Sequence, residues 1–167
     1  MTDEQTPDAR PARARELDLA PHPEGGWFRR VYTASHGLDT SNGRRPAATL
    51  IHFYLQQHEH AAWHRVSSDE VWLWHGPAPL DVHLGGTGEQ PRTETVVRLD
   101  APGTPGAVQQ MLVPAGVWQQ SVPAEADASA RPEGRRLDDH GVLVSCLVTP
   151  GFDFADWQLE ANTVNPG

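Results

Sequence analysis

A histidine and a glutamate near the middle of the chain have the residue types and the spacing that acid–base chemistry needs. His64 and Glu70 fall on the two arms of an expected hairpin, on either side of a turn at Ser67-Ser68. Residues two apart on a strand share a face, so an inward Glu70 brings Trp72 and Trp74 to the inner face with it. Burial raises the pKa of a carboxyl group, and a neighbouring imidazole opposes that rise by stabilising the anion. The pair is therefore a candidate general base and general acid near neutral pH.

A glutamine further along the chain is a candidate third polar group of the same interior. Gln119 follows a tight Pro-x-Gly turn at 114–116 and opens another expected strand. One imidazole, one carboxylate and one amide among tryptophan walls are typical of a small-molecule site, which is mostly apolar with a few convergent polar groups. A structural interpretation stays open beside this one, because Trp72 and Trp74 can be core residues and Gln119 can satisfy buried backbone groups.

A segment rich in glycine and proline near the start adds candidate substrate-binding residues at the mouth of such a site. Gly25-Gly26 indicates a positive φ or a close approach of another backbone. His22 and Glu24 are expected either to reach over the mouth or to cap strand ends in a structural turn. Arg29, which points inward if Trp27 does, is expected to bind an anionic group of the substrate through its guanidinium.

Short segments separated by turn signals predict the elements that position these residues. The chain contains 15 glycines and 15 prolines, which interrupt helices and argue against a helical bundle. About ten short segments with strand character follow one another at the spacing of a sandwich or barrel. The predicted fold class is therefore all-β, with strands at 27–33, 47–55, 61–66, 69–75, 80–84, 93–99, 108–113, 118–122 and 142–148.

The other segments are expected to form a short helix, loops and tails around one domain. A helix is predicted from about Asp8 to Asp18, and a single helical turn is predicted after Asp153, its N-cap. At 167 residues the chain is long enough for one domain with a proper core. The expected organisation is a tail or frayed helix at 1–16, one domain at 17–160 with a polar loop at 35–45 and a surface loop at 123–141, and a C-terminal tail at 161–167.

The composition excludes several classes of function. With 13 basic and 22 acidic residues the net charge is -9, which disfavours nucleic acids and anionic membranes as partners. All the basic residues are arginines, so a Schiff-base lysine is excluded. The lone Cys146 excludes a disulfide scaffold and is expected to be a core thiol. No apolar run approaches the roughly 18 residues of a membrane span, and no apolar signal region is evident, so a cytoplasmic location is expected.

Four sequence blocks occur in order along the chain: PHPEGGWFR at 21–29, WHRVSSDEVW at 63–72, VPAGVWQ at 113–119 and PGFDF at 150–154. These blocks resemble those of the cupin superfamily, and within it an uncharacterised RmlC-like cupin family. The resemblance implies a double-stranded β-helix, the cupin jelly-roll barrel, with a short N-terminal helix and a short C-terminal helical turn.

The same resemblance bears on metal binding. The general cupin pattern supplies metal ligands from His-x-His, a glutamate and a later histidine, and the matching positions here are His64, Val66, Glu70 and Gln119. Valine cannot coordinate a metal, and one imidazole with one carboxylate is a poor transition-metal site. The RmlC-type sugar-nucleotide epimerases have lost the same ligands and use acid–base chemistry without a metal, so no metal and no cofactor are expected.

These observations lead to one preferred function and two alternatives. The preferred function is a homodimeric, metal-independent isomerase or epimerase that binds a small polar molecule, sugar-like or a ketone or enol, with His64 and Glu70 catalytic. The alternatives are a metal-dependent dioxygenase or isomerase that uses His64, Glu70 and Gln119, and a non-catalytic module that binds a small molecule. The homodimer is expected because the strand at 47–55 is apolar on both faces and because Val71 and Leu73 point outward.

Overall fold

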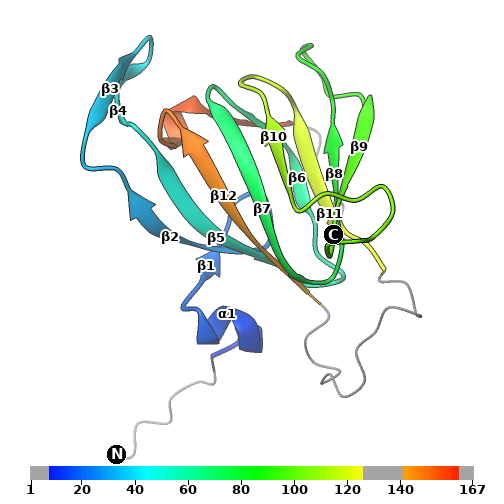
Figure 1. Ribbon diagram of the computed structural model, residues 1–167. Helices are drawn as coiled ribbons and strands as arrows, with labels where there is room; N and C mark the ends of the chain where they lie inside the picture. The colour runs from blue at the N-terminus through cyan, green and yellow to red at the C-terminus, as the bar shows by residue number, and fades with distance from the viewer. Residues whose placement is uncertain (1–7, 126–140, 162–167) are drawn as a thin grey trace, which may run out of the picture.

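The computed structural model describes residues 8–125 and 141–161, which form two antiparallel sheets that face each other and a separate two-stranded hairpin (Figure 1). The six-stranded sheet has the order β1-β2-β5-β12-β7-β10, and the five-stranded sheet has the order β13-β6-β11-β8-β9. The strands are β1 (Ala20–Pro21), β2 (Trp27–Thr33), β3 (Gly37–Thr40), β4 (Gly43–Pro46), β5 (Thr49–Leu55), β6 (Ala61–Val66), β7 (Asp69–Pro77), β8 (Leu80–Leu84), β9 (Thr95–Leu99), β10 (Gln110–Val113), β11 (Gln119–Pro123), β12 (Val142–Thr149) and β13 (Trp157–Leu159).

Alternate residues of the strands fill the space between the two sheets. Phe53 of β5 and Val144 of β12 meet Leu80 and Val82 of β8 in one hydrophobic cluster, where each is at most 1% exposed. This is the alternation of an antiparallel sheet with one buried face, in which every second side chain enters the core. The all-β prediction is confirmed.

The strand register brings candidate site residues to the inner walls of both sheets. In the five-stranded sheet Gln119 of β11 pairs with His64 of β6. In the six-stranded sheet Glu70 lies at the start of β7, between Val113 of β10 and Val148 of β12. The hairpin expected to carry His64 and Glu70 on its two arms is therefore wrong, because β6 and β7 belong to different sheets. The two residues come to the same space only because the sheets face each other.

A short helix covers part of the outer face of the six-stranded sheet. Ala14 of α1 (Ala12–Glu16) and the following Leu19 form a second hydrophobic cluster with Tyr54, and Trp27 packs against it. Trp27 therefore points outward, and so does Arg29, whose Nη1 donates to the Leu17 carbonyl at 3.4 Å. The expectation that Arg29 points into the barrel is wrong, because the apolar residues of the helix provide an outer burial site that strand alternation cannot reveal.

The polar loop predicted at 35–45 is instead largely a hairpin, formed by β3 and β4. Ser41 and Asn42 make its turn, and Gly43, the first residue of β4, has a φ of 104°. The hairpin is tied to the distant Asp156. Arg45 Nε donates to Asp156 Oδ2 at 2.6 Å, and Asn42 Nδ2 donates to Asp156 Oδ1 at 2.8 Å. Polar tertiary contacts stabilise the hairpin. Its sequence therefore lacks the hydrophobic alternation from which strands are predicted.

The remaining segments follow the expectations in part. The helical turn after Asp153 is confirmed as the 3-10 helix η2 (Phe154–Asp156), with Asp153 Oδ1 accepting from the Ala155 amide at 2.8 Å. The helix predicted at 8–18 is shorter, at five residues. Most of the expected surface loop at 123–141 and parts of both tails lie outside the described residues. Within those residues no helix is long and apolar enough to cross a membrane.

The outer face of the six-stranded sheet carries an apolar row that runs across its central strands. Leu50, Leu147, Val71 and Leu112 are successive cross-strand neighbours on β5, β12, β7 and β10. Leu112 at the end of the row is 51% exposed. The other three residues are half-buried. An apolar row on the outer face of a sheet is typical of an association surface.

The homodimer expected from the sequence stays a prediction, and this row is the surface that would carry it. Val71→Asp places a charge at the centre of the row, so we expect it to lower the sedimentation mass from two chains to one without changing the melting temperature by more than a few degrees. The matched control is Val96→Asp on the outer side of β9, where the valine is 48% exposed and the mass should not change. A wild-type mass of one chain at micromolar concentration would contradict the dimer.

Candidate functional site

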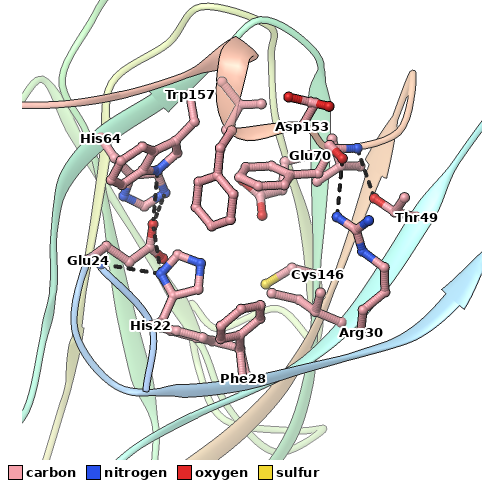
Figure 2. Close-up of a pocket in the computed structure, with 16 residues that line it drawn as sticks. His22, Glu24, Phe28, Arg30, Thr49, His64, Glu70, Cys146, Asp153 and Trp157 are labelled. Carbon is pink, nitrogen blue, oxygen red and sulfur yellow. Dashed lines mark hydrogen bonds and ion pairs between the residues drawn. The ribbon is translucent and has the colours of Figure 1, made fainter. Parts of the chain in front are cut away.

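A cavity of about 400 Å³ lies between the sheets, and residues from both ends of the described chain help to line it (Figure 2). The N-terminal turn, β2, β5, β6, β7, β12 and the segment around η2 all contribute to its wall. The polar lining residues are His22, Glu24, Arg30, Thr49, His64, Glu70, Cys146 and Asp153. The apolar lining residues are Phe28, Ile51, Phe53, Val66, Val148, Phe152, Phe154 and Trp157.

The glycine pair of the N-terminal turn positions Glu24 inside the barrel. Gly25 and Gly26 have φ angles of 108° and 71°, which L side chains rarely adopt. A Cβ atom on Gly25 would also collide with the carbonyl oxygen of His60. The Ala62 amide donates to the Glu24 carbonyl at 2.7 Å and fixes the turn against β6. Both features expected of the glycine pair, positive φ and close backbone approach, are confirmed.

Glu24 meets His64 in the buried part of the cavity. Glu24 Oε2 lies 3.3 Å from His64 Nε2, and the two side chains are 8% and 3% exposed. The other ring nitrogen of His64, Nδ1, lies 2.8 Å from the carbonyl oxygen of Ala62. A carbonyl only accepts, so Nδ1 carries a proton, and Nε2 of the neutral ring is left to accept a proton from the Glu24 carboxyl.

Burial shifts the pKa values of this pair in opposite directions. Loss of solvent raises the pKa of Glu24 to about 8, against which the Trp157 indole N–H, 3.4 Å away, acts weakly. Burial also lowers the pKa of His64, and the nearby Glu70 carboxylate and the bond to Ala62 oppose that shift. Near neutral pH, Glu24 is therefore largely protonated and His64 is neutral.

His22 is held as a neutral ring with a defined tautomer. The Glu24 amide donates to His22 Nδ1 at 3.2 Å, so this nitrogen is unprotonated and Nε2 carries the hydrogen. The ring packs edge-on against Phe28, at 4.5 Å between centroids, and burial lowers its pKa to about 4. In Figure 2 the second ring nitrogen of His22 faces the centre of the cavity. His22 therefore offers a fixed N–H donor to a bound molecule.

Glu70 lies across the cavity in a different hydrogen-bonding environment. Gln119 Nε2 donates a short hydrogen bond to Glu70 Oε2, and Trp72 Nε1 donates to Gln119 Oε1 at 2.9 Å. Burial raises the pKa of Glu70, and the nearby Glu24 carboxyl group adds to the rise. The Gln119 amide and the Cys146 thiol oppose it, and His64 does so only when its ring is protonated. Trp72 thus orients Gln119, and Gln119 orients the carboxylate.

The structure brings together some of the residues predicted as a site and separates others. His22, Glu24, His64 and Glu70 all line the cavity. Gln119 does not line the cavity but donates a hydrogen bond to the Glu70 carboxylate. Trp72 and Trp74 do not line the cavity, because Trp72 supports Gln119 and Trp74 Nε1 donates to the Ala78 carbonyl at 2.9 Å.

Arg30 and the aromatic residues near η2 line the cavity although the sequence did not single them out as site residues. Phe28 and Arg30 share the inner face of β2, the face opposite to the one chosen from Trp27. Strand alternation places Phe28 and Arg30 together on one face of β2. Each face of this strand combines aromatic and arginine side chains, so the sequence does not show which face meets the core. Phe154 and Trp157 enter the wall through the fold of the C-terminal segment, for which no periodicity exists.

Comparisons with known proteins agree with this architecture. The family model described as Cupin superfamily (DUF985) matches residues 12–160. A hypothetical protein from Leishmania major is 31% identical, with a TM-score of 0.73 over 90% of this chain and 88% of that chain. A Shewanella oneidensis protein is 28% identical, with a TM-score of 0.73 over 90% of this chain and 85% of that chain. A Klebsiella pneumoniae protein with a double-stranded β-helix domain shares the fold at 11% identity, with a TM-score of 0.53 over 88% and 94% of the two chains.

The same comparisons confirm the double-stranded β-helix that the sequence blocks implied. No significant match was found among curated proteins. The comparisons therefore establish the fold, whereas the chemistry of the cavity depends on the side chains that line it.

The side chains at the usual cupin metal positions do not fit a metal ion. Val66 offers no donor atom, and Gln119 Oε1 already accepts from the Trp72 indole. Across the described residues, no group of three histidine, cysteine or acidic side chains is arranged to hold an ion. The donor set favours proton chemistry over coordination.

The pKa of Glu24 predicts how stability depends on pH. Between pH 6.5 and 8 the unfolded chain has lost the Glu24 proton, ordinarily bound with a pKa of 4.5, while the folded chain retains it. Stability therefore falls as pH rises through this window, by about 2 kcal/mol for one retained proton. The lowered pKa values of His22 and His64 act below pH 6.5 and with the opposite sign.

Urea unfolding at several pH values checks this expectation. Glu24→Gln should flatten the fall between pH 6.5 and 8, because an amide does not titrate. Glu89→Gln, a substitution at an exposed glutamate, should keep the wild-type slope. Equal slopes for wild type and Glu24→Gln would show that Glu24 is ionised in the folded protein.

Proposed function

Because the chain belongs to the cupin superfamily, in the family described as DUF985, we propose that its barrel binds a small carbonyl or enol compound and moves a proton on it. The reaction class is a metal-independent isomerisation or epimerisation. The observation that carries this proposal is the burial of Glu24, His64 and Glu70 together on the wall of one cavity. Burying such groups costs free energy, and perturbed carboxyl groups in a cleft mark functional sites.

The two carboxyl groups suit different roles because their surroundings differ. Glu70 accepts from the Gln119 amide and the Cys146 thiol, which favour its ionised form. Glu24 lies beside His64 and accepts a long hydrogen bond from the Trp157 indole, and its pKa of about 8 keeps a proton on it at neutral pH. We assign Glu70 as the general base and Glu24 as the general acid, with His64 as the partner that holds the Glu24 proton.

The proposed reaction follows from these roles. The Glu70 carboxylate removes a proton from the carbon next to a carbonyl, and the C–H electron pair moves onto the carbonyl oxygen as an enolate. The N–H of His22 donates a hydrogen bond to that oxygen as its charge grows, as a preorganised donor in a dry site should. Glu24 then gives its proton to the second carbon or to the oxygen, and proton exchange through His64 restores both carboxyl groups.

The cavity wall narrows the type of compound. Its lining is mainly aromatic and aliphatic, with polar atoms confined to a few positions. A keto or enol compound with an apolar body matches such a wall better than a sugar, whose many hydroxyl groups each need a partner. The RmlC-like assignment, with its sugar-nucleotide substrates, remains a prediction from sequence resemblance.

Hydrogen–deuterium exchange tests the proton transfer directly. We expect the protein to accelerate exchange into at least one member of a panel of 2-oxo acids and keto sugars in deuterated water, followed by proton NMR. Glu70→Gln should lower this rate by a factor of about 100 or more, because general base catalysis contributes 10² to 10⁴.

Two controls separate loss of chemistry from loss of structure. Glu70→Gln should melt at or above the wild-type temperature, because the amide keeps the shape and removes a buried charge. Glu89→Gln should leave the exchange rate unchanged. Binding of panel members without accelerated exchange in wild type would favour the alternative of a non-catalytic binding module.

Metal analysis tests the second alternative, a metal-dependent cupin that uses His64, Glu70 and Gln119. We expect less than 0.1 transition-metal ion per chain (about one per ten chains) after dialysis, and no change in melting temperature with a chelator, because the side chains present make a poor donor set. A stoichiometric metal that survives dialysis and whose removal lowers the melting temperature would contradict the metal-independent proposal.

A further inference from the structure

Arg30 brings a positive charge to the cavity that has no carboxylate partner among the described residues. It lines the cavity from β2, on the same face as Phe28, and it is the one arginine in the described part of the wall. Its Nη2 donates to the Phe152 carbonyl at 3.1 Å. Arg10, Arg13, Arg29, Arg44, Arg45 and Arg98 each form an ion pair with an acidic side chain. Arg30 instead keeps most of its N–H donors for another acceptor.

The acidic groups of the same wall do not neutralise this charge. Asp153 also lines the cavity, but its Oδ1 accepts from the Ala155 amide and no ion pair joins it to Arg30. Glu24 has a pKa of about 8 and is largely uncharged at neutral pH. Glu70 accepts from the Gln119 amide, and no ion pair joins it to Arg30 among the described residues. In a chain of net charge -9 the long-range field repels anions, so an anion needs a specific cation to be bound here.

Aromatic rings form the part of the wall that leads from Arg30 to the buried carboxyl groups. Phe152 and Phe154 pack edge-on at 5.0 Å between centroids, and Phe154 and Trp157 do so at 5.7 Å. Phe154 is 50% exposed, which is unusual for a ring that lines a cavity. A flat apolar body would cover this exposed ring and fill the space beside it.

The cavity has room for a ring and a charged substituent. A dry protein cavity of about 150 Å³ holds benzene. This cavity measures about 400 Å³, so it can hold an aromatic ring together with a short acidic side chain. Figure 2 places Arg30 on the opposite side of the cavity from Glu24 and His22.

From these observations we propose that the cavity selects a small aromatic carboxylic acid, with its carboxylate on the Arg30 guanidinium and its ring against Phe154 and Trp157. The inference rests on the proposed function and names its substrate class. The guanidinium fork matches a carboxylate in two parallel hydrogen bonds, which a neutral amide cannot reproduce. The carbon that reacts then lies on the far side of the ring or chain, toward Glu24 and Glu70.

The experiment compares two probes of the same shape and different charge. Phenylacetate and phenylacetamide are titrated into the wild-type protein by isothermal calorimetry at neutral pH and 150 mM salt. We expect wild type to bind phenylacetate at least tenfold more tightly than phenylacetamide. Arg30→Gln should remove this preference, and Arg30→Lys, which keeps the charge without the fork, should retain part of it.

Arg29→Gln is the matched control, because it removes the same charge from the next residue of β2 on the outer face. It should keep the wild-type preference for phenylacetate. Equal binding of the two probes in wild type, or equal loss in Arg29→Gln and Arg30→Gln, would overturn the role of Arg30. Binding of neither probe would overturn the aromatic-acid class. The proton-exchange experiment decides the proposed function separately, because its panel includes compounds without an aromatic ring or a carboxylate.

Discussion

The contact between Glu24 and His64 is the interaction on which the arrangement of the cavity depends. A carboxyl group buried between two apolar sheets must either keep its proton or find a charged partner. Here burial raises the pKa of Glu24 to about 8, so this carboxyl group keeps its proton at neutral pH. Its Oε2 lies 3.3 Å from His64 Nε2, while Nδ1 of the same ring is fixed by the Ala62 carbonyl. The pair satisfies both groups without a net buried charge, so the barrel can enclose them and still leave a space beside them.

Chain segments far apart in sequence hold this contact in place. The turn with Gly25 carries Glu24 against β6, where the Ala62 amide donates a hydrogen bond to the Glu24 carbonyl. From the other end of the described chain, Trp157 reaches Glu24 with its indole N–H. Asp156, bound to Arg45, ties that same segment to the hairpin of β3 and β4. A shift in any of these anchors would change the spacing of the acid–base groups, which is why the site is a property of the closed barrel.

The fold and the chemistry of this protein are separable. The relatives from Leishmania major and Shewanella oneidensis share the architecture at TM-scores of 0.73. The barrel offers inner positions on facing sheets, and the side chains at those positions decide the reaction. At two positions where a cupin metal site has histidines, this chain has Val66, which adds only an apolar wall, and Gln119, which serves as a hydrogen-bond donor to Glu70. The same frame that holds a metal elsewhere can therefore hold a pair of buried carboxyl groups in different hydrogen-bonding surroundings.

The sequence by itself determined most strands of the two sheets and the helical turn after Asp153, because strand alternation and turn residues are local properties. It did not determine the partner of His64, which is Glu24 and not Glu70, because β6 and β7 lie in different sheets. The glycine pair revealed a tight turn that carries His22 and Glu24. Only the tertiary structure decided that Arg30 and not Arg29 faces the cavity. Each face of β2 carries both aromatic and arginine side chains, and the packing of Trp27 against the cluster formed with α1 selects which face turns outward. The tertiary structure also decided that Glu24 retains a proton and that Trp72 supports Gln119, because burial and hydrogen-bond partners arise when the sheets close on each other.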